Sequence, residues 1–354
     1  MSRYFSGKYA ALTPYTPGEQ PGGREYVKLN TNESPFPPSP KALEYARQHT
    51  RSLELYSDPE GTELREALAE LYGISPEEIM LVNGSDEVLN FAFMAWCDEE
   101  HPAVFPDITY GFYPVFAQLN RVPYREIPLK EDLSIDPKDY HGAGGTLFIA
   151  NPNAPTGKLL PLSDIEGIIA ANPENIVVVD EAYVDFGGVS ALPLIRKYGN
   201  LLVTRTFSKS RSMAGARLGF GAACPALIAD LNTLRYSTNP YNVNSMTLAL
   251  GLGTVLDEET TRRNCAEIIR VREKTTRALR ALGFEVPDSA ANFVFARSAK
   301  IGGEALYRRL RERGILVRHF SKERIADWIR ITIGTEAQMD TLLAAVRAIL
   351  EETP

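Results

Sequence analysis

The chain contains the stretch Val203-Thr204-Arg205-Thr206-Phe207-Ser208-Lys209-Ser210-Arg211-Ser212-Met213-Ala214-Gly215-Ala216-Arg217-Leu218-Gly219-Phe220, which follows an apolar run, residues 200–204, typical of a buried strand. Lys209 stands at the exit of this strand, between two serines. Burial and nearby cations lower the pKa of a lysine and make its amine a nucleophile toward an aldehyde. Such cations could come from three arginines of the stretch, Arg205, Arg211 and Arg217. Ser208 and Arg217 could bind a phosphate. A solvated basic turn would have the same composition.

A second apolar run upstream, residues 176–186, contains the sequence Asp180-Glu181-Ala182-Tyr183. A carboxylate at the end of a buried strand is costly unless it has a partner. A protonated pyridine nitrogen would be such a partner for Asp180.

These motifs occur in a characteristic order: Asp-Glu-Ala-Tyr at 180–183, Ser-Lys at 208–209 and Ala-Gly-x-Arg-x-Gly at 214–219. With them the chain resembles the fold type I family of pyridoxal-phosphate-dependent aminotransferases, from about Leu12 to the last helix. The resemblance implies an α/β fold, with a large doubly wound domain around a mostly parallel sheet and a smaller α+β domain. It implies pyridoxal 5'-phosphate as cofactor, held covalently by Lys209, with Asp180 on the pyridine nitrogen and Tyr183 donating to the phenolic oxygen.

The length of 354 residues and the alternation of helical and strand periods predict how the chain divides into domains. We expect an N-terminal arm with part of the small domain at 1–39, the large cofactor-binding domain at 40–244 and the C-terminal small domain at 245–354. One long helix is predicted to start after residues 239–244 and to continue past Glu258. Beyond it we expect helices at 262–282, 303–313 and 336–352, and strands at 293–296, 315–317 and 328–333.

Composition argues against several classes of protein. The net charge of −7 gives no electrostatic case for binding nucleic acid or an anionic membrane. Three widely spaced cysteines argue against a disulfide framework, and the four histidines show no metal-ligand spacing. No apolar run reaches membrane-spanning length and the N-terminus lacks a signal peptide's apolar core, so we expect a cytoplasmic protein without a metal.

The cofactor's phosphate is expected at Gly84-Ser85-Asp86, where a strand passes through glycine into a helix. The free N–H groups of a helix start bind anions, although an ordinary capped helix has the same pattern and two carboxylates there oppose a phosphate. The resemblance nevertheless assigns this junction to the phosphate, together with Ser208 and Arg217. It also implies that Tyr110 stacks on the pyridine ring, whereas an aromatic cluster of this kind is otherwise more often core.

One motif departs from the family pattern. The common form has asparagine directly before Pro-Thr-Gly, where it binds the phenolic oxygen, and this chain has Ala154 there. Asn153 is the nearest candidate to supply the contact, with Asn151 as an alternative. The alternation of side chains in extended backbone argues against an easy exchange.

The substrate site is expected to use residues from several segments. Arg330 stands in the apolar strand 328–333, which indicates an anionic partner, either a substrate carboxylate or a structural ion pair. The resemblance implies the first and extends the site to four more residues: Tyr15, Asn32, Tyr56 and Arg318. Tyr15 belongs to an arm that reaches across a homodimer in the family, and Tyr56 is expected to enter the partner's site. The role of Arg324 stays open.

Within the family the resemblance is greatest to enzymes that transfer the amino group of L-histidinol phosphate to 2-oxoglutarate, giving imidazole-acetol phosphate and glutamate in histidine biosynthesis. Alternatives on the same scaffold are an aromatic amino acid aminotransferase and a threonine-phosphate decarboxylase. A non-catalytic regulator is disfavoured, because about 40 residues before the first helix leave no room for a DNA-binding domain and Lys209 is intact.

Overall fold

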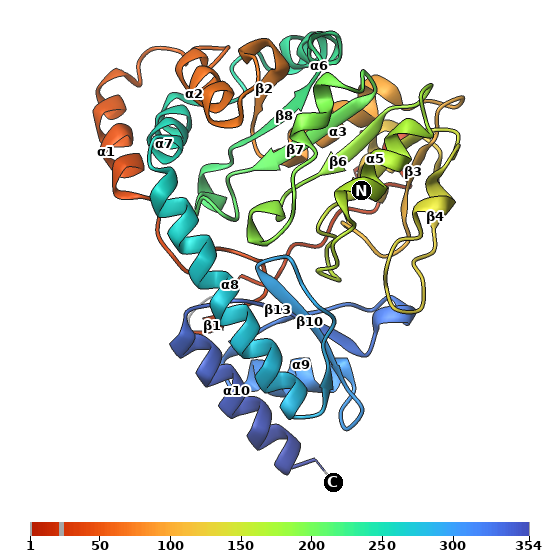
Figure 1. Ribbon diagram of the computed structural model, residues 1–354, viewed down its shortest axis with the longest axis vertical. Coiled ribbons are helices and arrows are strands. Elements are labelled where there is room, and N and C mark those ends of the chain that lie inside the picture. The colour runs from red at the N-terminus through yellow and green to blue at the C-terminus, as the bar shows by residue number, and fades with distance from the viewer. Residues whose placement is uncertain (1, 21–24, 354) are drawn as a thin grey trace.

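Seven strands form one central sheet in the computed structural model, which describes residues 2–20 and 25–353 (Figure 1). Its strands lie in the order β2 (Ile79–Val82), β8 (Gly219–Ala223), β7 (Leu201–Thr206), β6 (Val177–Asp180), β5 (Thr146–Ala150), β3 (Ala103–Pro106) and β4 (Tyr124–Ile127). Strand β8 is antiparallel to both neighbours, and the other pairs are parallel. Sheets of this kind are covered on both faces, which explains the continuous apolar runs.

Helices cover both faces of this sheet. On one face lie α3 (Ser85–Trp96), α4 (Tyr113–Asn120) and α6 (Pro225–Thr238); on the other lie α2 (Thr62–Tyr72), α5 (Leu162–Ala170) and α7 (Ser245–Val255). Alternate strand residues supply the two cores: Leu147 and Ile149 pack on the second group, whereas Phe148 packs on the first. Helix α1 (Pro40–His49) lies against α7, with Gly253 on the backbone of Ala42.

A second, antiparallel sheet organises the C-terminal part of the chain. Its order is β12 (Arg318–His319), β13 (Trp328–Thr332), β10 (Phe293–Ser298) and β9 (Phe284–Glu285). Helices α8 (Glu258–Ala281), α9 (Gly303–Glu312) and α10 (Glu336–Glu351) surround it with one apolar core (Figure 1). Strand β1 (Val27–Lys28) pairs with β11 (Ile315–Leu316), so the N-terminal segment joins this part of the molecule. The predicted fold class is confirmed.

The long helix predicted after residue 244 is in fact two helices. Helix α7 ends at Val255, and α8 starts at Glu258. Asp257 between them has φ −121° and ψ 50°, outside the helical region. Helix α7 packs on the large sheet's side, while α8 continues into the small sheet's core (Figure 1). The domain boundaries at 39/40 and 244/245 stay a prediction.

The described residues contain neither a membrane-spanning helix nor a metal-binding cluster. No helix in 2–20 and 25–353 combines the length and apolarity needed to cross a bilayer. Over the same ranges, no group of three or more His, Cys, Asp or Glu side chains is arranged to hold a metal ion.

Candidate active site

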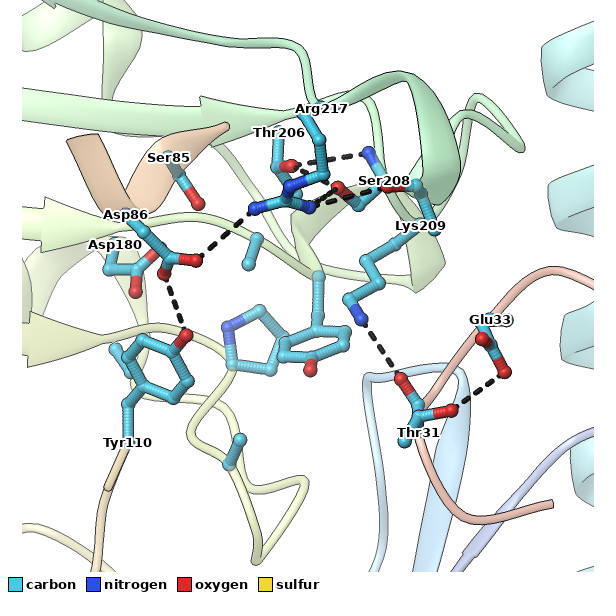
Figure 2. Close-up of a pocket in the computed structure, with 16 residues that line it drawn as sticks. Thr31, Glu33, Ser85, Asp86, Tyr110, Asp180, Thr206, Ser208, Lys209 and Arg217 are labelled. Carbon is cyan, nitrogen blue, oxygen red and sulfur yellow. Dashed lines mark hydrogen bonds and ion pairs between the residues drawn. The ribbon is translucent and has the colours of Figure 1, made fainter. Parts of the chain in front are cut away.

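Two adjoining cavities open where β5, β6 and β7 end. The smaller has a volume of about 230 Å³ and the larger about 400 Å³. Residues from distant segments line both: Thr31, Tyr110, Ala154, Tyr183 and Lys209. Figure 2 shows the smaller cavity, with Lys209 on one side and Asp86 and Asp180 on the other. In doubly wound sheets ligands bind at this edge, beyond the carboxyl ends of the strands.

Lys209 follows β7, and its Nζ donates to the backbone oxygen of Thr31 at 3.1 Å. Burial and the nearby Arg330 cation lower the pKa of Lys209 to about 8. A fraction of the amine is therefore neutral near physiological pH, as a nucleophile or a base requires. Arg217 also lowers this pKa, but the predicted cations Arg205 and Arg211 are engaged elsewhere, with Asp185 and Glu258.

Asp180 is the last residue of β6 and accepts hydrogen bonds from three neutral donors: Thr204 Oγ1 and Tyr113 Oη, each at 3.1 Å, and the backbone N–H of Ala182. It forms no ion pair within residues 2–20 and 25–353, and burial raises its pKa to about 6. A buried carboxylate with only neutral donors is stabilised by any cation placed beside it. The site therefore fits a protonated ring nitrogen.

The Tyr183 hydroxyl is buried and accepts a hydrogen bond from Asn32 Nδ2 at 2.9 Å. Its ring stands edge-on to Phe293, with centroids 5.1 Å apart. Burial raises the pKa of Tyr183, so the hydroxyl keeps its proton at neutral pH and can donate it in a hydrogen bond.

The Gly84-Ser85-Asp86 junction lies beside Ser208 and Arg217, as the phosphate prediction requires (Figure 2). Gly84 has φ +77°, and a Cβ there would lie 2.5 Å from Arg217 Nη2, so only glycine fits. Arg217 donates to Ser208 Oγ and to Asp86 Oδ2, each at 3.3 Å.

The two acidic side chains of this junction do not both face the cavity. Glu87 turns away and accepts from the Asn83 N–H at 2.7 Å. Asp86 lines the cavity between Arg217 and Tyr110, whose hydroxyl donates to Asp86 Oδ1 at 2.7 Å (Figure 2). Tyr110 is thereby fixed on the cavity wall.

Asn153 lines neither cavity. Its side chain is buried and already bonded: Oδ1 accepts from Thr109 Oγ1, and Nδ2 donates to Ile108 O and Thr156 Oγ1. Asn151 is equally occupied, by both backbone groups of Leu160. Ala154 does line both cavities, but its methyl group offers no hydrogen bond.

Arg330 and Arg318 lie together in the larger cavity, from neighbouring strands β13 and β12. Arg330 donates through Nη2 to Asn30 O at 3.1 Å, and its buried Nε has no hydrogen-bond partner among the described residues. It has no carboxylate partner among the described residues, so the structural ion pair is not observed there. Arg318 donates to the backbone oxygens of Thr16 and Pro17. Two guanidinium groups without acidic partners suit an anionic ligand.

The remaining predicted residues are divided between the cavity and the surface. Tyr15 and Asn32 line the larger cavity, and the Tyr15 ring stacks on Phe112 at 4.2 Å. Tyr56 lies outside both cavities: it is 82% exposed and stacks on Tyr241. Arg324 binds Asp107 and the backbone oxygen of Leu129, so it ties the small sheet's side to the loop after β3.

Sequence reasoning did not identify the site roles of Thr31 and Tyr113. Tyr113 has a local signal, because it is one helical turn after Tyr110 and shares its side of the segment. The contact of Thr31 with Lys209 joins residues 178 positions apart, for which the sequence has no local signal.

Comparison with known proteins first identifies the class of protein. Residues 24–346 match the family model described as aminotransferase class I and II. The chain belongs to that family.

Its relatives narrow the class to one group. The chain is 49% identical to a histidinol-phosphate aminotransferase of Aromatoleum aromaticum, over 99% of this chain and 100% of that protein. It is 48% identical to histidinol-phosphate aminotransferase 2 of Thiobacillus denitrificans, over 98% of each. The solved histidinol-phosphate aminotransferase of Sinorhizobium meliloti, a complex with pyridoxal-5'-phosphate, superposes with a TM-score of 0.90 and 25% identity, covering 100% of this chain and 99% of that one. Within the class, the chain is therefore a member of the histidinol-phosphate aminotransferases.

Proposed function

We propose that this protein transfers the amino group of L-histidinol phosphate to 2-oxoglutarate, giving imidazole-acetol phosphate and glutamate in histidine biosynthesis, with pyridoxal 5'-phosphate as cofactor. Similarity to histidinol-phosphate aminotransferases over nearly the whole chain supports the substrate. The observation in the site that carries the proposal is the pair of arginines, Arg318 and Arg330, in the cavity that Lys209 also lines.

The smaller cavity supplies the groups that pyridoxal phosphate needs. The ring of this cofactor, when bound, accepts electrons from the substrate carbon. Asp180 would stabilise a proton on the ring nitrogen, and Tyr183 would donate to the phenolic oxygen. Gly84, Ser85, Asp86, Ser208 and Arg217 would hold the phosphate, with Tyr110 against the ring.

Lys209 is the residue we assign to proton transfer. Its Nζ lies at the boundary of the two cavities, and its pKa of about 8 leaves part of the amine free as a base. A base with a pKa near the working pH combines a useful neutral fraction with proton affinity. We therefore assign Lys209 both the covalent attachment of the cofactor and the removal of the proton from the substrate carbon.

One site must accept two different anions, a phosphate ester and a dicarboxylate. Arg330 is close enough to Lys209 to lower the pKa of that lysine, whereas Arg318 contacts the N-terminal arm through the backbone oxygens of Thr16 and Pro17. Both present guanidinium groups, which bind carboxylates and phosphates through paired N–H donors. We assign Arg318 to the phosphate and Arg330 to the carboxylate or its equivalent.

We further propose a cytoplasmic homodimer. The surface around Tyr56 supports an interface, because Leu53 and Leu55 are also exposed, by 56% and 67%. An apolar surface of this kind beside the predicted cross-subunit tyrosine fits a partner's active site. The three cysteines are free, which suits a reducing compartment.

The test of the substrate compares Arg318→Gln with the control Arg313→Gln, a surface arginine bound to Glu352. We expect Arg318→Gln to lower kcat/KM for L-histidinol phosphate by roughly 10- to 100-fold, the effect of losing a charged hydrogen bond. Its kcat/KM for phenylalanine should change little, and Arg313→Gln should behave as wild type. An equal loss for both substrates would contradict the phosphate role. Release of CO₂ from threonine phosphate would indicate a lyase.

A further inference from the structure

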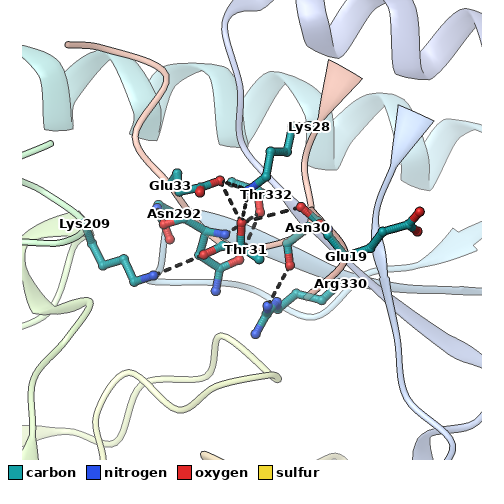
Figure 3. Close-up of polar contacts among 10 residues, drawn as sticks. Glu19, Lys28, Asn30, Thr31, Glu33, Lys209, Asn292, Arg330 and Thr332 are labelled. Carbon is teal, nitrogen blue, oxygen red and sulfur yellow. Dashed lines mark hydrogen bonds and ion pairs between the residues drawn. The ribbon is translucent and has the colours of Figure 1, made fainter. Parts of the chain in front are cut away.

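The segment Asn30–Glu33 crosses the site and contacts its main cationic groups (Figure 3). The oxygen of Asn30 accepts from Arg330, and the oxygen of Thr31 accepts from Lys209. Glu33 pairs with Lys28 at the other end. The segment therefore bridges the small sheet and the strand exits of the large sheet.

Asn32 is the most constrained residue of this segment. It is 1% exposed and has φ +58°, a left-handed conformation that asparagine adopts more readily than most other residues with a Cβ. Its N–H donates to Thr332 Oγ1 at 2.9 Å, and its backbone oxygen accepts from Asn292 Nδ2 at 3.0 Å. These contacts hold the backbone of Asn32 in one orientation.

The hydrogen bonds around Asn32 fix the direction of each proton. Thr332 Oγ1 already accepts the Asn32 N–H, so its own proton goes to Asn32 Oδ1, 3.0 Å away. The amide therefore presents Nδ2 to Tyr183, whose hydroxyl accepts at 2.9 Å. The opposite amide orientation would leave the Thr332 proton without an acceptor there. Because Tyr183 accepts from Asn32, its own proton is free for another acceptor.

We propose that Asn32, oriented by Thr332, is a positioning residue that directs the hydroxyl proton of Tyr183 into the cavity, toward an oxygen anion of the bound cofactor. Tyr183 lines both cavities, so an acceptor bound there is within the reach of its proton. Ala154, on the same wall and in the same apolar cluster, has no group to share this task. For pyridoxal phosphate the acceptor is the phenolic oxygen, so this inference rests on the proposed cofactor.

A hydrogen bond to the phenolic oxygen stabilises its negative charge and so makes the neighbouring nitrogen, linked to Lys209, easier to deprotonate. The visible absorbance of the cofactor-loaded protein reports this deprotonation as a function of pH. Loss of the Asn32 contact should therefore raise the pH midpoint of the spectral change. This signal does not depend on turnover.

The test is a spectral pH titration of the cofactor-loaded variant Asn32→Gly, in wild-type and Tyr183→Phe backgrounds. Glycine removes the side chain but tolerates φ +58°, and no charge is added. We expect the midpoint to rise by roughly half to one pH unit in the wild-type background, the size of one hydrogen bond. In the Tyr183→Phe background the same change should add nothing.

Thr332 supplies a second, independent pair of variants. Thr332→Val removes the hydroxyl at similar volume and should raise the midpoint in the same direction, whereas Thr332→Ser should leave it unchanged. An unchanged midpoint in Asn32→Gly, or an equal rise in both backgrounds, would overturn the inference. If wild type shows no visible band with pyridoxal phosphate, the proposed cofactor itself fails, and that outcome is distinct from the other two.

Discussion

At the scale of single residues, the site depends on charges that are buried without full compensation. Asp180 has only neutral donors and no cation among the described residues, and Lys209 lies near Arg217 and Arg330. Each group is thereby shifted toward its neutral form. A bound cofactor with a cationic nitrogen and an anionic oxygen would offset part of the free-energy cost of holding these groups in their charged forms.

Tyr113→Phe tests this balance. Burial already raises the pKa of Asp180 to about 6, and removal of one donor to the carboxylate should raise that pKa further. Since the carboxylate is the form that stabilises the ring nitrogen, cofactor affinity should fall as pH drops through this pKa. The measurement is the cofactor Kd as a function of pH, between about pH 5 and about pH 8. We expect the acidic limb of this curve, where affinity falls with decreasing pH, to move to higher pH by roughly half to one unit.

Tyr140→Phe is the matched control for that experiment. Tyr140 is also fully buried, but its hydroxyl has no hydrogen-bond partner among the described residues, and it lies in the core on the other face of the sheet. Its removal should leave the acidic limb in place. If cofactor affinity in Tyr113→Phe falls at the same acidic pH as in wild type, then the tyrosine does not act on Asp180.

At the scale of elements, local patterns predicted much of the structure and failed where the signal is not local. The helices predicted at 303–313 and 336–352 and the strand predicted at 328–333 each end only one residue earlier in the structure, because a glycine or a polar residue marks their ends. The break between α7 and α8 was missed, since apolar residues continue the helical period through Leu256. Lys209 and Asp180 were found because each stands at a strand exit, whereas the Asn32–Tyr183 contact spans 151 positions.

The junction between β2 and α3 offers a test at this scale. Gly84→Ala would strain a backbone with φ +77° and push against Arg217 Nη2 at the phosphate end. We expect the cofactor Kd to rise at least about 10-fold, which corresponds to about 1.4 kcal/mol. Gly73→Ala is the control: φ is +65°, but the added Cβ meets nothing within 4 Å.

Gly84→Ala should lose more stability than Gly73→Ala, because Gly84 has ψ 155°, in a region that essentially only glycine adopts, whereas Gly73 has ψ 33°, in the left-handed helical region where alanine costs about 1 kcal/mol. Only Gly84→Ala should lose cofactor affinity, measured by absorbance titration. Equal cofactor affinity in the two variants would contradict the proposal that this junction binds the phosphate.

At the scale of the whole molecule, the site is assembled from both sheets and from the N-terminal segment, which joins the small sheet through β1. Tyr56 lies outside both cavities, and its exposure is what a cross-subunit role requires. Sequence periodicity carries no information about a partner chain. The homodimer therefore rests on the resemblance and on the exposed surface around Tyr56.

Subunit mixing tests the shared site. Lys209→Ala and Tyr56→Ala should each be nearly inactive alone. After co-expression and isolation of mixed dimers, one of the two sites would combine an intact Lys209 with an intact Tyr56. The isolated mixed dimers should recover roughly half of wild-type activity, because each has one complete site of two, and an unseparated random mixture should recover roughly a quarter, because about half of its dimers are mixed. Activity no greater than the sum of the separate variants, or an active monomer by light scattering, would contradict the shared site.

The central claim is tested most directly by a single half-reaction. Purified protein loaded with pyridoxal phosphate is mixed with L-histidinol phosphate, without any oxo acid, and the visible spectrum is recorded, with Lys209→Ala as the blank and phenylalanine in parallel. We predict that low concentrations of L-histidinol phosphate convert the visible band to that of the pyridoxamine form of the cofactor. A band that responds to phenylalanine but not to L-histidinol phosphate would contradict the proposed substrate, and conversion by Lys209→Ala at the wild-type rate would contradict the assigned role of the lysine.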